Sequence, residues 1–119
     1  MIRIDRSSPI PVYKQIIYQI KKDILLGRLK DGDKLPTVRD LAEKLNVNVN
    51  TVLKAYERLV VEGILDSIQG KGYFVRGETS IERGILEDLR KIVSRMKGSG
   101  VDLGLAMILL QEVWNDEKV

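Results

Sequence analysis

Residues 37–63 read TVRDLAEKLNVNVNTVLKAYERLVVEG, and this stretch decides the fold. Thr37 with Asp40 three positions later is close to a capping box, which predicts that a helix begins here and runs over about 37–45 with Leu41, Ala42 and Leu45 facing inward. The short amides around residues 46–48 interrupt it. Apolar residues then recur at helical spacing until Gly63: Val49, Val52, Ala55, Tyr56, Leu59 and Val60. The stretch predicts two helices joined by a tight turn.

A further helix is expected before this pair, at about 11–26. Its apolar stripe is formed by Tyr13, Ile16, Ile17, Ile20 and Ile24. Pro11 suits the first helical turn, and Gly27 suits the position just past the end. After Gly63 the period changes, because 64–68 and 73–75 are short apolar runs flanking Gln69-Gly70-Lys71-Gly72. These runs predict a β-hairpin with a basic tip.

The remainder of the chain predicts two helices. Residues 77–80 form a candidate linker. The next helix is expected to start at Ile81 and carries one apolar stripe: Ile81, Ile85, Leu89, Ile92 and Met96. The segment 103–114 is apolar nearly all round and includes Leu105, Ile108, Leu109 and Trp114. A small monomer cannot cover such a helix, so we expect a partner subunit to bury it. The expected organisation is a domain over 1–76, a linker over 77–80 and a two-helix dimerisation tail over 81–119.

Composition excludes many function classes. The 119 residues contain no Cys and no His, which removes disulfides, thiolate or imidazole metal sites, and His-based catalysis. No catalytic residue, metal ligand or cofactor site is expected. No apolar run reaches the roughly 18 residues needed to cross a bilayer, and no signal peptide begins the chain, so we expect a cytoplasmic protein without membrane contact. Residues 1–77 carry 14 Lys and Arg against 9 Asp and Glu, which favours a polyanionic partner.

Three helices followed by a hairpin predict a fold class that is mainly α with a small β-hairpin wing: a winged helix-turn-helix plus a short α-helical dimerisation tail. In this motif the third helix enters the major groove of DNA. Its exposed polar residues are Asn48, Asn50, Thr51 and Lys54. Asn pairs with adenine, whereas Lys reaches guanine or a phosphate. The third helix is therefore the expected base-reading element.

Two further elements are expected to contact the DNA. Thr37 and the start of its helix offer donors to a phosphate, and Arg39 in the same turn offers a fork suited to a phosphate or a guanine. As a cation in a first helical turn, Arg39 opposes the helix dipole, which suggests a reason outside the fold. At the wing tip, Gly70 and Gly72 let the backbone approach the minor groove while Lys71 supplies charge.

Each feature also has a purely structural interpretation. Asn48 serves equally well as a helix cap, Tyr56 is a core residue rather than a base contact, and the tip glycines also suit the turn alone. The main alternative function is a winged-helix module that acts through a protein partner. An enzyme is disfavoured because no carboxylate pair, phosphate loop or triad can be written from this sequence.

The sequence also resembles a known family. Over residues 9–76, the segments 35–42, 50–52, 62–63 and 70–75 resemble the GntR-type winged-helix repressors, and 8–16 with 47–52 resemble the YtrA subfamily. The resemblance implies a homodimeric bacterial regulator on a palindromic operator, often beside genes for an ABC transporter, and places all nine residues proposed above at DNA-contacting positions. Thr37 replaces the commoner Ser, and Leu53 stands where many members have Arg. No effector is evident.

Overall fold

The computed structural model describes residues 2–76 and 84–119. The chain forms two compact units, Met1–Glu82 and Arg83–Val119. The elements follow the predicted order: α1 Val12–Leu25, α2 Val38–Leu45, α3 Val49–Val61, β1 Leu65–Ile68, β2 Gly72–Val75, α4 Gly84–Gly98 and α5 Leu103–Trp114. The predicted fold class, mainly helical with one two-stranded hairpin, is confirmed.

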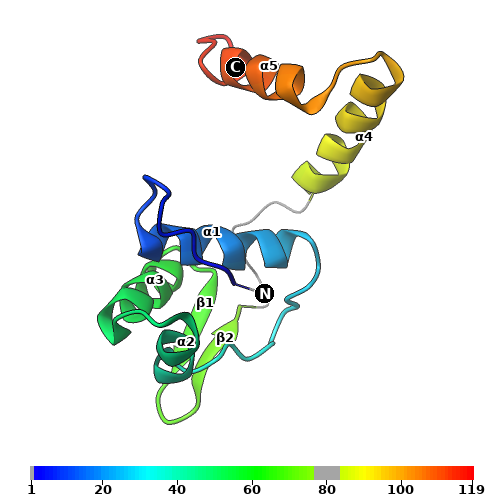
Figure 1. Cartoon of the computed structure of the whole chain (residues 1–119). Helices are drawn as coiled ribbons and strands as arrows, with labels where there is room; N and C mark the ends of the chain where they lie inside the picture. Colours follow the sequence, from blue (N-terminus) through cyan, green and yellow to red (C-terminus); the bar gives the residue numbers. More distant parts are fainter. Residues whose placement is uncertain (1, 77–83) are drawn as a thin grey trace. The chain divides into compact units, whose positions relative to one another are not determined.

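The core of the first unit lies around α3, which packs against both α1 and α2 (Figure 1). The predicted inward stripes are buried: Ile16, Ile17, Ile20 and Ile24 from α1, Leu41 and Ala42 from α2, and Val52, Ala55, Tyr56 and Leu59 from α3. The interpretation of Tyr56 as a core residue is confirmed, since its side chain is fully buried. Each of these three helices would be only marginally stable alone, so the burial of their apolar faces stabilises them.

Three details differ from the sequence prediction. Pro11 is the N-cap of α1 rather than a residue of its first turn, because its ψ of 145° is extended. Val49 is 44% exposed, since it opens α3 before the helix reaches the core. Tyr13 and Leu45 are only half-buried at the ends of their stripes.

The hairpin pairs β1 and β2 in antiparallel register, with Leu65 opposite Val75 and Ile68 opposite Gly72. Lys34 adds a single bridge to Phe74, so the chain before α2 runs along the outer edge of β2. At the base, the Arg76 guanidinium donates to the Asp66 carboxylate at 2.8 Å. This ion pair joins the two strands at the end of the hairpin that lies next to α3.

The second unit contains α4 and α5. Asp102 caps α5 by accepting a hydrogen bond from the backbone N–H of Leu105 at 2.9 Å. The proposed linker over 77–80 and the expected helix start at Ile81 lie outside the described residues. In residues 2–76 and 84–119, no helix has the length and apolarity to cross a membrane, and no group of three or more acidic side chains could hold a metal ion.

Candidate nucleic-acid interface

The N-terminus of α2 is a fixed, open helix end. Thr37 has an extended backbone, and its hydroxyl accepts a hydrogen bond from the backbone N–H of Asp40 at 3.1 Å. The capping function predicted for Thr37 is confirmed. Arg39 is exposed in the same first turn. The other N–H groups of this turn and the Arg39 guanidinium are donors suited to an anion.

The turn between α2 and α3 depends on one residue with a left-handed backbone conformation. Asn46 has φ 53° and ψ 52° and ends α2, with its backbone N–H donating to Glu43. Arg6, from the segment before α1, donates to the carbonyl oxygens of Leu45 at 3.0 Å and Asn46 at 2.8 Å. A cation at a helix C-terminus also complements the helix dipole. Arg6 therefore helps to set the angle at which α3 follows α2.

The segment that carries Arg6 is held along α1. Gln15 is buried; its amide accepts from the backbone N–H of Asp5 at 2.8 Å and donates to the carbonyl of Asp5 at 2.9 Å. One turn later, the Gln19 amide makes the same reciprocal pair with the backbone of Arg3. These contacts place Arg6 at the turn.

The N-terminal half of α3 presents polar side chains. Asn48 is the N-cap, with its side-chain oxygen accepting from the backbone N–H of Asn50 at 2.7 Å. Asn50 is exposed and Thr51 is half-buried. The capping interpretation of Asn48 is therefore confirmed. Asn50, the second residue of α3, exposes its side-chain amide to solvent.

Lys54 lies one turn further along α3 and contacts α1. Its ammonium nitrogen sits 4.0 Å from the ring centroid of Tyr13. A cation–π contact at an exposed site contributes about 0.5–1 kcal/mol. The contact turns the charge toward the α1 side of the helix and leaves it accessible, because Lys54 remains exposed.

The hairpin tip is an exposed turn. Gly70 has φ 76° and Gly72 has φ 116°, so both adopt backbone conformations that other residues rarely reach. A Cβ on Gly72 would also lie 3.3 Å from Lys34. Lys71, between them, is exposed. Both glycines are thus required by the turn itself.

These elements belong to one unit, and Figure 1 shows the hairpin tip and α2 on the side of that unit that faces away from α1.

The sequence alone did not indicate the contacts that Arg6 and Tyr13 make at this interface. A basic residue two positions before Ser8-Pro9 carried no local pattern, and Tyr13 was assigned to the buried stripe.

The tail residues proposed for dimerisation lie on α4 and α5, and these two helices bury none of them. Seven are between 40% and 80% exposed: Ile85, Leu89, Ile92, Leu105, Ile108, Leu109 and Trp114. Met96 is half-buried. Neither helix buries a residue in the part of the chain that the structure describes.

Residues 12–75 match the family described as bacterial regulatory proteins, gntR family. This match covers α1 to β2, which includes every helix and strand of the candidate interface. The chain belongs to the GntR family. The resemblance inferred from the sequence is thereby confirmed, and so is the expectation of a regulatory protein rather than an enzyme, since the family consists of regulators.

This GntR-family chain is similar over nearly its whole length to a curated relative. It is 39% identical to the HTH-type transcriptional repressor YtrA of Bacillus subtilis, across 99% of this chain and 95% of that protein. It is also similar to a solved structure of YtrA from Sulfolobus acidocaldarius, a GntR-family transcription factor, with 45% identity, a TM-score of 0.62, and coverage of 82% of this chain and 97% of that one. The expected likeness to the YtrA type is confirmed.

A third similarity concerns DNA. The DNA-binding domain of AraR, solved in complex with operator ORX1, is 34% identical with a TM-score of 0.55, and the match covers 60% of this chain and 89% of that one. That structure places a domain of this fold on an operator.

Proposed function

We propose that this GntR-family protein is a transcriptional repressor that binds operator DNA through α3. The observation that carries the proposal is the exposed polar start of α3, where Asn48, Asn50 and Thr51 follow a turn fixed on both sides. An α-helix fits the major groove, and the first residues of such a helix reach base edges. The likeness to the AraR domain, which was solved with its operator, supports DNA as the partner.

We assign the other contacts to the phosphate backbone. The first turn of α2, which Thr37 opens, presents backbone N–H donors at Val38 and Arg39, and the Arg39 side chain offers a planar fork of N–H groups that matches a phosphate. Lys71 at the tip of the hairpin supplies charge to the adjacent minor groove, with Gly70 and Gly72 allowing close backbone approach. Phosphate contacts of this kind orient the protein while the bases specify the site.

We further propose a homodimer that binds a two-fold symmetric operator. The uncovered apolar side chains of α4 and α5 support this assembly, because contiguous apolar surface on a soluble chain marks an interaction site. Two copies related by a two-fold axis would present two α3 helices to successive half-sites. Residues 1–76 would then read DNA and 81–119 would pair the subunits.

The YtrA-type organisation supports a proposal for the regulated genes as well. We propose that they include an operon for an ABC transporter. A repressor of chromosomal genes acts in the cytoplasm, which is where we place the protein.

Fluorescence anisotropy on DNA from upstream of its own gene tests the function. At about 150 mM salt, we expect binding about 10³-fold tighter than to a scrambled duplex. Asn50→Ala is expected to lower this ratio, because it removes a base contact, while Lys22→Ala at the end of α1 leaves it unchanged. Equal affinity for the scrambled duplex and for every fragment from upstream of the gene would overturn the proposal.

Sedimentation velocity tests the assembly. We expect a dimer at micromolar concentration, and we expect Leu109→Glu to yield a monomer because the carboxylate would be buried in the interface. Glu112→Gln, on the same helix, is the control and should remain dimeric. A wild-type monomer at this concentration would contradict the proposed dimer. The proposal of DNA binding is tested separately, by the anisotropy measurement.

A further inference from the structure

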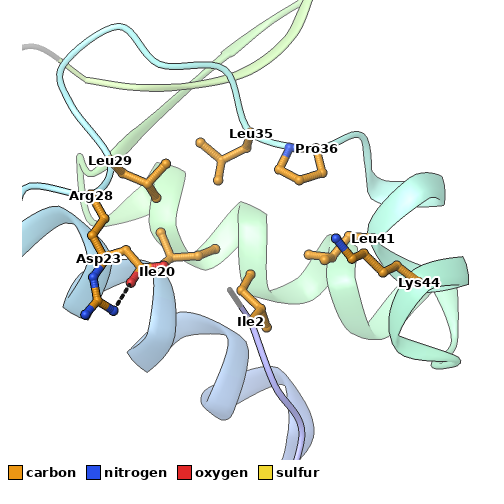
Figure 2. A pocket seen from close by; sticks show the side chains of 9 residues that line it. All are labelled: Ile2, Ile20, Asp23, Arg28, Leu29, Leu35, Pro36, Leu41 and Lys44. Carbon is orange, nitrogen blue, oxygen red and sulfur yellow. Dashed lines mark hydrogen bonds and ion pairs between the residues drawn. The ribbon is translucent and has the colours of Figure 1, made fainter.

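A partly open cavity of about 260 Å³ lies in the first unit, and no residue of α3 lines it (Figure 2). Figure 2 shows that side chains from four separate segments surround it. Its apolar wall is formed by Ile2, Ile20, Leu29, Leu35, Pro36 and Leu41. The N-terminal segment, α1, the 28–36 loop and α2 therefore all contribute to its wall, and one side stays open to solvent.

The size and lining of this cavity favour a small, largely hydrocarbon molecule. An apolar cavity of about 150 Å³ stays dry and binds benzene, so this one has room for a single substituted ring. It lies just below the roughly 300 Å³ at which pockets begin to accept drug-sized ligands. The occupant should thus contain one ring and a short substituent.

Three polar side chains also line the wall: Asp23, Arg28 and Lys44. The Asp23 side chain is only 14% exposed, and its carboxylate accepts from the Arg28 guanidinium at 3.5 Å. That contact is at the long limit of a hydrogen bond, and a carboxylate has capacity for several donors. Arg28 already balances the charge of Asp23, and Lys44 is not without a partner of its own. The ligand therefore needs a donor but no charge.

We infer that this cavity is a binding site for a small neutral molecule with an apolar body and one hydroxyl or N–H group that donates to Asp23. The inference does not depend on DNA binding. Its position has a consequence for regulation, because Leu35 and Pro36 immediately precede the α2 N-cap. A ligand packed on these two residues acts directly on the helix end that we assign to the phosphate backbone.

Two isomeric probes test the inference on the full-length protein. Benzyl alcohol and anisole have the same formula and nearly the same shape, but only benzyl alcohol carries a donor. In methyl NMR titrations, we expect saturable shifts confined to Ile2, Ile20, Leu29, Leu35 and Leu41. We expect benzyl alcohol to bind about fivefold more tightly than anisole, the effect of one added hydrogen bond.

Substitutions distinguish the hydrogen bond to Asp23 from nonspecific apolar binding. Asp23→Ala should abolish the preference for benzyl alcohol while anisole still binds. Asp66→Ala is the matched control, because Asp66 is also a carboxylate paired with an arginine but lies in the hairpin outside the cavity. Absence of saturable shifts, shifts spread over methyls elsewhere, equal affinity for the two isomers, or tighter binding of benzoate or benzylamine would each overturn the inference.

Discussion

The hydroxyl of Tyr56 donates a 2.8 Å hydrogen bond to the backbone carbonyl oxygen of Pro36. The bond joins the middle of α3 to the residue just before the N-cap of α2. The Tyr56 ring is also in edge contact with Tyr73 of β2, at 4.8 Å between ring centroids. One buried side chain therefore links the three elements of the proposed DNA surface: α2, α3 and the hairpin.

Tyr56→Phe should loosen this link. The substitution leaves the Pro36 carbonyl without its partner, so we expect a loss of about 1–2 kcal/mol in the free energy of unfolding, measured by urea denaturation. Burial raises the pKa of the Tyr56 hydroxyl, which therefore stays a donor wherever the protein is folded. DNA affinity should fall at temperatures where the variant is fully folded. Tyr73→Phe retains the ring contact and is the control; equal effects of both changes would contradict the prediction.

The local features of this fold could be predicted from the sequence because they depend on neighbours a few positions apart. The stripes of α1, α2 and α3, the caps at Thr37 and Asn48, and the hairpin all follow from spacing or from the chemistry of short polar side chains. The resemblance to the GntR family rested on the same residues. Burial then confirmed which face of each helix is internal.

The contacts that set the angles between these elements could not be predicted. Arg6 and Asn46 are 40 positions apart, and Lys54 and Tyr13 lie on different helices. Such pairs depend on how the helices pack, which no local pattern records. The cavity is a similar case, because its wall combines residues from Ile2 to Leu41 that share no periodicity.

Asn46 should tolerate glycine but not alanine. Its left-handed backbone costs a residue with an ordinary Cβ about 1–2 kcal/mol, whereas glycine adopts it freely and asparagine tolerates it. We expect Asn46→Ala to lower the free energy of unfolding by about 1 kcal/mol and Asn46→Gly to leave it nearly unchanged, in urea titrations. Equal stability of the two variants would show that the turn does not impose this conformation.

Arg6→Ala should weaken the turn between α2 and α3. The change removes two hydrogen bonds from a charged donor to exposed carbonyls, so we expect a modest loss of about 0.5–1 kcal/mol. Amide exchange at residues 46–48 should accelerate, as measured by NMR. Arg3→Ala is the matched control, because Arg3 contacts Gln19 through its backbone and keeps those bonds. Unchanged exchange in Arg6→Ala would exclude this function of Arg6.

The Asp5 carboxyl should titrate below its ordinary pKa of 3.8. Hydrogen bonds from the Ser7 hydroxyl at 2.6 Å and the Ser7 backbone N–H at 3.0 Å favour the charged form and lower this pKa. The stabilisation is therefore complete above the unfolded pKa and is lost as pH falls through the lower folded pKa. In NMR titrations, Ser7→Ala should raise the pKa of Asp5, while Ser8→Ala, which retains the backbone donor, should not.

Lys54 should act on DNA through a phosphate rather than a base. The Tyr13 ring holds its ammonium toward α1. We therefore expect Lys54→Gln to weaken binding to operator and scrambled duplexes by the same factor. The slope of log affinity against log salt should fall by about 1, the value for one lost phosphate contact. Lys14→Gln, next to Tyr13 on α1, is the control for general charge loss. A loss confined to the operator, with the salt slope unchanged, would instead identify Lys54 as a base-reading residue.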